Sequence, residues 1–204
     1  MYLVRHGSTG ANEGGKRQSP ETALDKNGEI QAQKTANWLS DKKIELILSS
    51  PWARAKQTAE TIGQKLDLPI TFLKILQEKA HNPDLYGASF EDEIHRQYVR
   101  ESEKDRDNID WKLRGKGESV REMLTRGVEF EAMLGERYRE KTLVVVSHAY
   151  FIKGLVAICL EGKNFDTKEF RERYKTTPVD NGSISLLENE REGSNWAAVF
   201  LNLL

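Results

Sequence analysis

The stretch Tyr2-Leu3-Val4-Arg5-His6-Gly7 decides how the chain is interpreted. Its apolar part is typical of a buried strand, and the glycine after it permits a sharp turn of the backbone. A reactive pair on the turn that follows a strand is how open α/β sheets position their chemistry. A second arginine and a second histidine, Arg54 and His148, follow later strands, so this stretch is part of a larger set.

Strands and helices alternate along the rest of the chain. Strands are expected at 2–6, 46–48, 70–73 (or on to 76), 143–146, 183–187 and 197–201, and helices at 27–40, 51–66, 118–140 and after 148. Ser50 is expected to cap the second helix and Pro51 to begin it. The alternation predicts an α/β fold, a three-layer α/β/α sandwich with a mostly parallel, doubly wound sheet.

Residues 82–116 break this alternation with a charge-dense stretch. A chain of 204 residues suits one domain, so we expect a single domain over 1–204. Within it, 82–116 is expected to be a helical cap inserted over the edge of the sheet where ligands bind. A solvated helical excursion is the alternative.

The amino-acid composition limits the classes of binding partner to be expected. Lys and Arg (31) nearly balance Asp and Glu (32), so no overall field favours nucleic acid or a membrane surface. The single cysteine, Cys159, excludes an intrachain disulfide, and its apolar neighbours predict a packed thiol. No signal peptide or membrane span is visible, and the default expectation is a cytoplasmic protein. The sequence indicates no oligomeric state.

Polar side chains follow four of the predicted strands: Arg5 and His6, Arg54, Glu78, and His148. Because the carboxyl ends of parallel strands share one edge, we expect these side chains to converge. Two guanidiniums and two imidazoles beside helix N-termini suit a compact dianion such as a phosphoryl group. HExxH, CxxC and P-loop motifs are absent from the sequence, so no metal, cofactor or P-loop nucleotide is expected.

His6 is the candidate nucleophile, because flanking arginines oppose protonation of its ring. A carbonyl at the Gly7 turn can fix its tautomer. His148 would hydrogen-bond the transferring group, and Glu78 would protonate the leaving alkoxide. Each residue alone has a structural explanation, and the combination favours function. Two other carboxylates compete for the role of acid, Asp84 and Asp92.

Ordered blocks of sequence resemble the histidine phosphatase superfamily, the phosphoglycerate-mutase-like proteins. The blocks are Leu3-Val4-Arg5-His6-Gly7 with Asn12, Thr22-Ala23-Leu24 with Gly28, Ser49-Ser50-Pro51-Trp52-Ala53-Arg54-Ala55, Gly117-Glu118-Ser119, Val145-Val146-Ser147-His148-Ala149 and Asn181-Gly182-Ser183-Ile184. The resemblance implies a phosphohistidine at His6, a phosphoryl group held by Arg5, Arg54 and His148, and Glu78 as the acid that later activates water. It also implies that Asn12 lines the pocket and that no metal takes part.

Some residues depart from the family pattern. Ser8 stands where many members have Glu or Gln, and the usual Gly-x-Trp-Glu-Gly segment is replaced by Glu78-Lys79-Ala80-His81-Asn82-Pro83. Lys16 and Arg17 either bind a second anionic group of the substrate or belong to a solvated loop.

The predicted function is a metal-independent phosphomonoesterase that hydrolyses a small phosphorylated metabolite through a phosphohistidine. One alternative is a cofactor-dependent phosphoglycerate mutase. The other is a noncatalytic phosphate-binding or interaction domain on the same scaffold.

Overall fold

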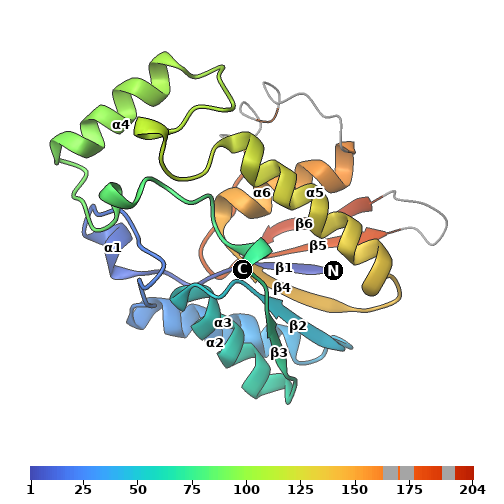
Figure 1. Ribbon diagram of the computed structural model, residues 1–204. Coiled ribbons are helices and arrows are strands. Elements are labelled where there is room, and N and C mark those ends of the chain that lie inside the picture. Colours follow the sequence, from blue (N-terminus) through green and yellow to red (C-terminus); the bar gives the residue numbers. More distant parts are fainter. Residues whose placement is uncertain (163–169, 171–176, 190–195) are drawn as a thin grey trace.

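The computed structural model describes residues 1–162, 170, 177–189 and 196–204. Among these residues six strands form one sheet in the order β3-β2-β4-β1-β5-β6 (Figure 1). The parallel strands are β1 (Tyr2–Arg5), β2 (Leu46–Ser49), β3 (Ile70–Phe72) and β4 (Leu143–Ser147). At one edge β5 (Ile184–Asn189) and β6 (Trp196–Leu203) run antiparallel. The sheet is mostly parallel, as predicted.

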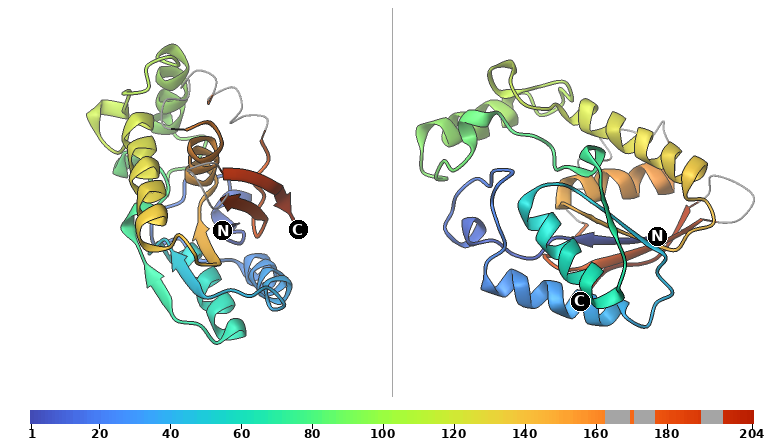
Figure 2. Two further views of the ribbon diagram at one scale, coloured as in Figure 1. Left: turned by 90° about the vertical axis from the view of Figure 1, so that its right-hand side faces the viewer. Right: turned by 60° about the horizontal axis from the view of Figure 1, so that its bottom comes forward.

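Helices cover both faces of this sheet (Figures 1 and 2). On one face lie α2 (Lys26–Leu39) and α3 (Ala53–Leu66), and on the other lie α5 (Val120–Arg137) and α6 (Ala149–Glu161). Alternate strand residues point to opposite faces. Leu3 of β1 accordingly belongs to the core beneath α5 and α6, and its neighbour Val4 to the core beneath α2 and α3. The predicted α/β fold is confirmed.

Local sequence sets where two of these helices begin. The Asp25 carboxylate accepts a hydrogen bond from the backbone N–H of Gly28 (2.7 Å) and caps α2. Ser119 and Glu122 form a reciprocal capping box at the start of α5. Helix α5 therefore starts two residues after the predicted position, because Ser119 takes the cap.

Further predicted boundaries are wrong. Helix α3 begins at Ala53 with Trp52 as its N-cap, because the Ser50 hydroxyl is engaged by Trp52 N–H (3.3 Å) and His148 Nε2 (2.8 Å). Strand β3 ends at Phe72, and a 3₁₀ turn, η1 (Lys74–Leu76), follows it. That turn buries Leu76 completely in the core beneath α5 and α6. The turn expected between the last two strands falls at 190–195, outside the described residues.

The segment 82–116 contains η2 (Pro83–Leu85), α4 (Glu93–Lys104) and η3 (Leu113–Gly115). It lies beside the loop that carries α1 (Gly10–Glu13), at the upper left of Figure 1. Backbone hydrogen bonds join the two segments, from Arg17 N–H to the Ala88 carbonyl and from Gly87 N–H to the Arg17 carbonyl, both 2.9 Å. The segment therefore rests on the loop that follows β1.

None of the helices in the described part of the chain is both long enough and apolar enough to cross a membrane.

Candidate active site

His6 lies directly after β1 and is buried, with 3% of its surface exposed. Its Nδ1 lies 2.7 Å from the carbonyl oxygen of Gly7, which accepts a hydrogen bond only if Nδ1 carries the proton. The Arg54 Nε–H donates to Nε2 of the same ring at 3.1 Å. Both contacts assign the lone pair of the neutral imidazole to Nε2, the nitrogen available for attack.

Two guanidiniums flank this ring. Arg54 is 2% exposed on the first turn of α3, and its Nη1 donates to the Ser19 carbonyl at 2.9 Å. Arg5 donates through Nη1 to the Val179 carbonyl at 2.7 Å. Burial lowers the pKa of His6 well below its usual value, and the charges of Arg54 and Arg5 lower it further. The arginines act as predicted, but burial is the larger cause.

His148 follows β4 and is fully buried, with its ring 5.0 Å from the His6 ring, centroid to centroid. The Ser50 hydroxyl accepts from Trp52 N–H (3.3 Å) and lies 2.8 Å from His148 Nε2, to which it can donate its own proton. Burial lowers the pKa of His148 well below its usual value, with Arg54, His6 and Arg5 adding to the effect. A neutral ring that accepts at Nε2 carries its proton on Nδ1, and this buried Nδ1 has no hydrogen-bond partner among the described residues.

Glu78 lies beyond η1 rather than directly after β3, and its carboxyl group faces the start of α6. Oε1 accepts from the N–H groups of Lys79 (2.9 Å) and Phe151 (3.0 Å), and Oε2 accepts from Tyr150 N–H (3.1 Å). Burial lowers the pKa of Arg54 to about 10, and the negative charge of Glu78 opposes that shift. Glu78 is therefore within electrostatic range of the guanidinium that contacts the nucleophile.

An ion pair that sequence reasoning missed holds the segment bearing Glu78. Arg126 of α5 and Glu118 form a bidentate pair (2.7 and 2.8 Å) whose side chains are 20% and 15% exposed. Nη1 of Arg126 also donates to the carbonyls of Ile75 (2.6 Å) and Gln77 (3.1 Å). Glu118 accepts from Ala80 N–H at 3.1 Å. The pair thus fixes the backbone on both sides of Glu78.

Three side chains from other parts of the chain support the loop after β1. The backbone N–H groups of Gly7 and Ser8 donate to Thr58 Oγ1 (3.2 Å) and to Gln31 Oε1 (2.7 Å). Asn181 Nδ2 donates to the His6 carbonyl at 2.9 Å. A Cβ on Gly7 would run into the backbone of Gly28, so this glycine is required for close approach to α2 rather than for a positive φ.

The structure brings together Arg5, His6, Arg54 and His148, with Glu78 next to them. The two rival carboxylates lie elsewhere: Asp84 is exposed beside Lys116 (3.6 Å), and Asp92 accepts from Ser89 N–H on the surface of the cap segment. Asn12 lies on α1, and its side chain is outside what the structure describes. Its predicted contact with substrate stays a prediction.

Among the described residues, no group of three or more His, Cys, Asp or Glu side chains is arranged to hold a metal ion. The positive charge next to the His6 ring comes from Arg54 and Arg5. Cys159 is buried in the core, and burial raises the pKa of its thiol, in agreement with the predicted packed cysteine.

Comparisons with known proteins agree with this geometry. A family model described as the histidine phosphatase superfamily (branch 1) matches residues 1–203. The chain is 31% identical over 157 residues to the uncharacterized phosphatase PhoE of Bacillus subtilis, covering 76% of this chain and 75% of that protein. It is 28% identical over 165 residues to the adenosylcobalamin/alpha-ribazole phosphatase of Escherichia coli, covering 77% of each.

A solved structure of a mycobacterial glucosyl-3-phosphoglycerate phosphatase, in complex with VO3, superimposes with a TM-score of 0.82 at 25% identity. The superposition covers 99% of this chain and 98% of that one. The chain belongs to the histidine phosphatase superfamily, branch 1. This confirms the family inferred from the sequence blocks. Membership and these phosphatase relatives identify the chain as a phosphoric monoester hydrolase.

Proposed function

We propose that the chain is a metal-independent phosphomonoesterase that hydrolyses a small phosphorylated metabolite through a phosphohistidine at His6. The observation that carries this proposal is the hydrogen bonding of the His6 ring. Gly7 holds the proton on Nδ1, and a buried arginine meets the lone pair on Nε2. A nucleophile and a guanidinium that can bind phosphoryl oxygens are thereby already in contact.

In the first step, Nε2 of His6 attacks phosphorus, and the bond from phosphorus to the ester oxygen breaks. Arg54 exchanges its contact with Nε2 for a phosphoryl oxygen, and Arg5 binds another. His148 donates a hydrogen bond to an oxygen of the same phosphoryl group from its Nδ1, which has no partner among the described residues. Protonated Glu78 gives its proton to the leaving alkoxide and becomes a carboxylate.

In the second step, the Glu78 carboxylate takes a proton from water while the water oxygen attacks phosphorus. The N–P bond breaks, which returns the lone pair to Nε2 and releases inorganic phosphate. Oε2 of Glu78 accepts one backbone hydrogen bond and Oε1 accepts two, so Oε2 is the oxygen with more capacity to carry the proton.

Several further statements belong to this proposal. We infer one domain over 1–204, with 82–116 as its cap, because that segment rests on the loop after β1 and lines the cavity beside Glu78. Two of the relatives named above, the adenosylcobalamin/alpha-ribazole phosphatase and the glucosyl-3-phosphoglycerate phosphatase, are named for chemically different phosphate esters, which supports a small phosphorylated partner without naming one. A cytoplasmic location stays a prediction from the sequence.

The test combines EDTA with trapping of the intermediate. The protein should hydrolyse p-nitrophenyl phosphate at an unchanged rate in EDTA, and a rapid quench should yield an acid-labile, base-stable phosphoryl adduct on His6. Loss of turnover in EDTA would contradict the proposal that arginines, without a metal ion, neutralise the charge of the phosphoryl group. Isomerisation of 3-phosphoglycerate faster than phosphate release would indicate the mutase, and phosphate binding without turnover would indicate a noncatalytic domain.

A further inference from the structure

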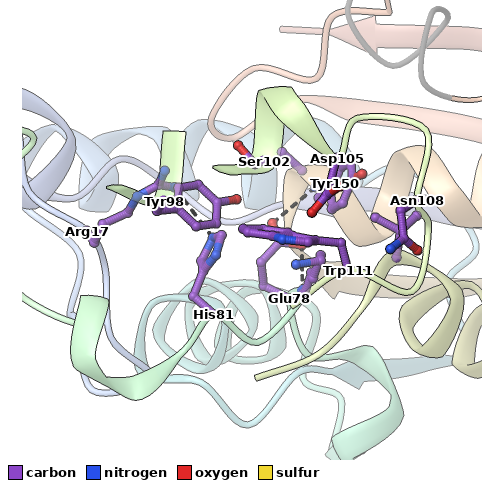
Figure 3. A pocket seen from close by; sticks show the side chains of 12 residues that line it. Arg17, Glu78, His81, Tyr98, Ser102, Asp105, Asn108, Trp111 and Tyr150 are labelled. Atoms are coloured by element: carbon purple, nitrogen blue, oxygen red, sulfur yellow. Dashed lines mark hydrogen bonds between the residues drawn. The ribbon is translucent and has the colours of Figure 1, made fainter. Parts of the chain in front are cut away.

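A cavity of about 380 Å³ opens beside Glu78 (Figure 3). Ala149 and Tyr150, which directly follow His148, line it. Tyr98 and Trp111 of the cap segment line it as well. A phosphate ester bound at His6, with its leaving oxygen at Glu78, would therefore extend its alcohol part into this cavity.

The size of the cavity bears on the substrate. A volume of about 380 Å³ falls in the range of pockets that enclose drug-sized ligands. A three-carbon alcohol would leave most of it filled with water and would contact the cap segment little. The dimensions favour a larger alcohol that reaches across to the cap.

The cap side of the cavity is aromatic. The rings of Tyr98 and Trp111 lie 5.7 Å apart, centroid to centroid, and are inclined at 51°. His81 meets the Tyr98 ring edge-on at 5.4 Å, and burial lowers the pKa of His81 to about 3, with Lys79, Arg17 and His95 adding to the shift. An uncharged imidazole and two aromatic rings form a surface suited to a flat, weakly polar group.

Arg17 and Lys79 also line the cavity, and Arg17 contacts its aromatic rings. Its guanidinium lies 4.7 Å above the Tyr98 ring centroid, and its Nε donates to His95 Nδ1 at 3.2 Å. Nη1 lies 3.5 Å from His81 Nε2. Arg17 therefore stiffens the aromatic wall, and the expectation of a solvated loop is wrong for this residue.

Polar groups complete the lining at the end of α4. Ser102, Asp105 and Asn108 recur at intervals of three residues and supply a hydroxyl, a carboxylate and an amide, whose oxygen already accepts from Asp110 N–H at 3.0 Å. The hydroxyl and carboxylate oxygens can accept hydrogen bonds from a substrate. The cavity therefore combines a flat apolar wall with acceptors for hydroxyl or amino groups.

We propose that the substrate is a phosphomonoester whose alcohol carries a planar ring with hydrogen-bond donors, and that the ring packs against Trp111 and Tyr98. Figure 3 shows both rings in the same cavity as Glu78. The inference rests on the proposed function, because it takes the phosphoryl group to be bound at His6. In this proposal the cap segment determines which substrate is preferred, and the residues at the edge of the sheet cleave the phosphate ester.

The test uses two esters, 2-phenylethyl phosphate and 3-methylbutyl phosphate. Their alcohols have similar acidity, so the leaving groups differ in size and in the presence of a ring rather than in reactivity. We expect kcat/KM for the ring ester to exceed that for the branched ester by about five- to tenfold. In W111L the ratio should fall close to one, and in W111F most of the preference should remain.

The matched control is Phe72→Leu, which removes an exposed ring on β3 that is not among the residues lining the cavity. Its ratio should equal that of the unmodified protein. Equal kcat/KM for both esters in the unmodified protein, or an unchanged ratio in W111L, would overturn the proposal.

A binding measurement separates failure of this inference from failure of the proposed function. Calorimetric titration with 2-phenylethylphosphonate and 3-methylbutylphosphonate requires no turnover. A preference for the ring compound that W111L removes supports the ring subsite even if neither ester is hydrolysed. Hydrolysis through His6 without any ring preference supports the phosphatase and rejects the subsite.

Discussion

The edge of the sheet and the cap segment are built in opposite ways. At the sheet edge, His6, Arg54 and His148 are almost completely buried and follow strands or begin a helix. In the cap segment, α4 carries a single buried residue, His95. Buried groups tied to the sheet keep one geometry, while a segment with few core contacts tolerates substitution. The difference suggests that the reaction is fixed by the sheet and the choice of substrate by the cap.

Removal of the nucleophile should have the largest effect. His6→Ala is expected to lower kcat/KM by at least about 10⁴-fold for ring-bearing and branched esters alike, because the covalent intermediate cannot form. Steady-state assays with both esters measure this, and an unchanged melting temperature shows that the fold persists. If the residual activity of the variant were still higher for the ring-bearing ester, the assignment of cleavage to the sheet edge and of substrate choice to the cap would be contradicted.

Glu78→Gln should have the next largest effect, and it should depend on the leaving group. We expect a loss of about 10²- to 10³-fold with alkyl phosphates and a much smaller loss with p-nitrophenyl phosphate, whose leaving group needs no proton. Asp84→Asn, which removes an exposed rival carboxylate, is the matched control and should leave both rates near their original values. Equal losses for both classes of ester would show that a residue other than Glu78 protonates the leaving group.

Disruption of the ion pair between Glu118 and Arg126 should give a smaller loss of rate with the same dependence on the leaving group. Arg126→Met is expected to lower kcat for alkyl phosphates by about tenfold and to affect p-nitrophenyl phosphate less, because it frees the backbone beside the acid. Combined with Glu78→Gln it should add little, since both changes act through one carboxyl group.

Arg121→Met is the control for that prediction. Arg121 lies on the same helix in an exposed ion pair with Asp110 (2.7 Å), so its loss should change neither rate. Equal effects of the Arg121 and Arg126 variants would indicate a general effect on α5 rather than positioning of Glu78.

The smallest expected change concerns pH. The nucleophilic form of His6 is neutral, and its pKa lies well below the ordinary value because of burial and the two arginines. That form therefore persists as the pH falls from 8 to 6 and is lost only below that range. With p-nitrophenyl phosphate, whose leaving group needs no proton from Glu78, kcat/KM should change less than about twofold over this interval after correction for the second ionisation of the ester. A tenfold loss per pH unit beginning near 6.5 would show an unshifted histidine.

Sequence patterns were sufficient where a local rule dictates structure. The uniformly apolar stretch 143–146 predicted a strand, and the strand observed there, β4, is buried throughout, as expected of a strand covered on both faces. The predicted tautomer of His6 required only a glycine turn directly after a strand. A predicted helix boundary was wrong where a side chain has a partner far away in the chain. The Ser50 hydroxyl, expected to cap a helix, lies 2.8 Å from His148 Nε2. A partner 98 positions away leaves no signal in the local sequence.

Local sequence signals were enough to predict the α/β fold, the family, and the residue types that converge on one anion, because strand ends, turns and ordered motifs are local or nearly local features. The folded structure was needed to show which carboxylate lies beside Arg54, how Glu118 and Arg126 hold it, and which rings of the cap line the neighbouring cavity. These contacts join segments far apart in the chain, and their geometry is set by packing across the whole molecule.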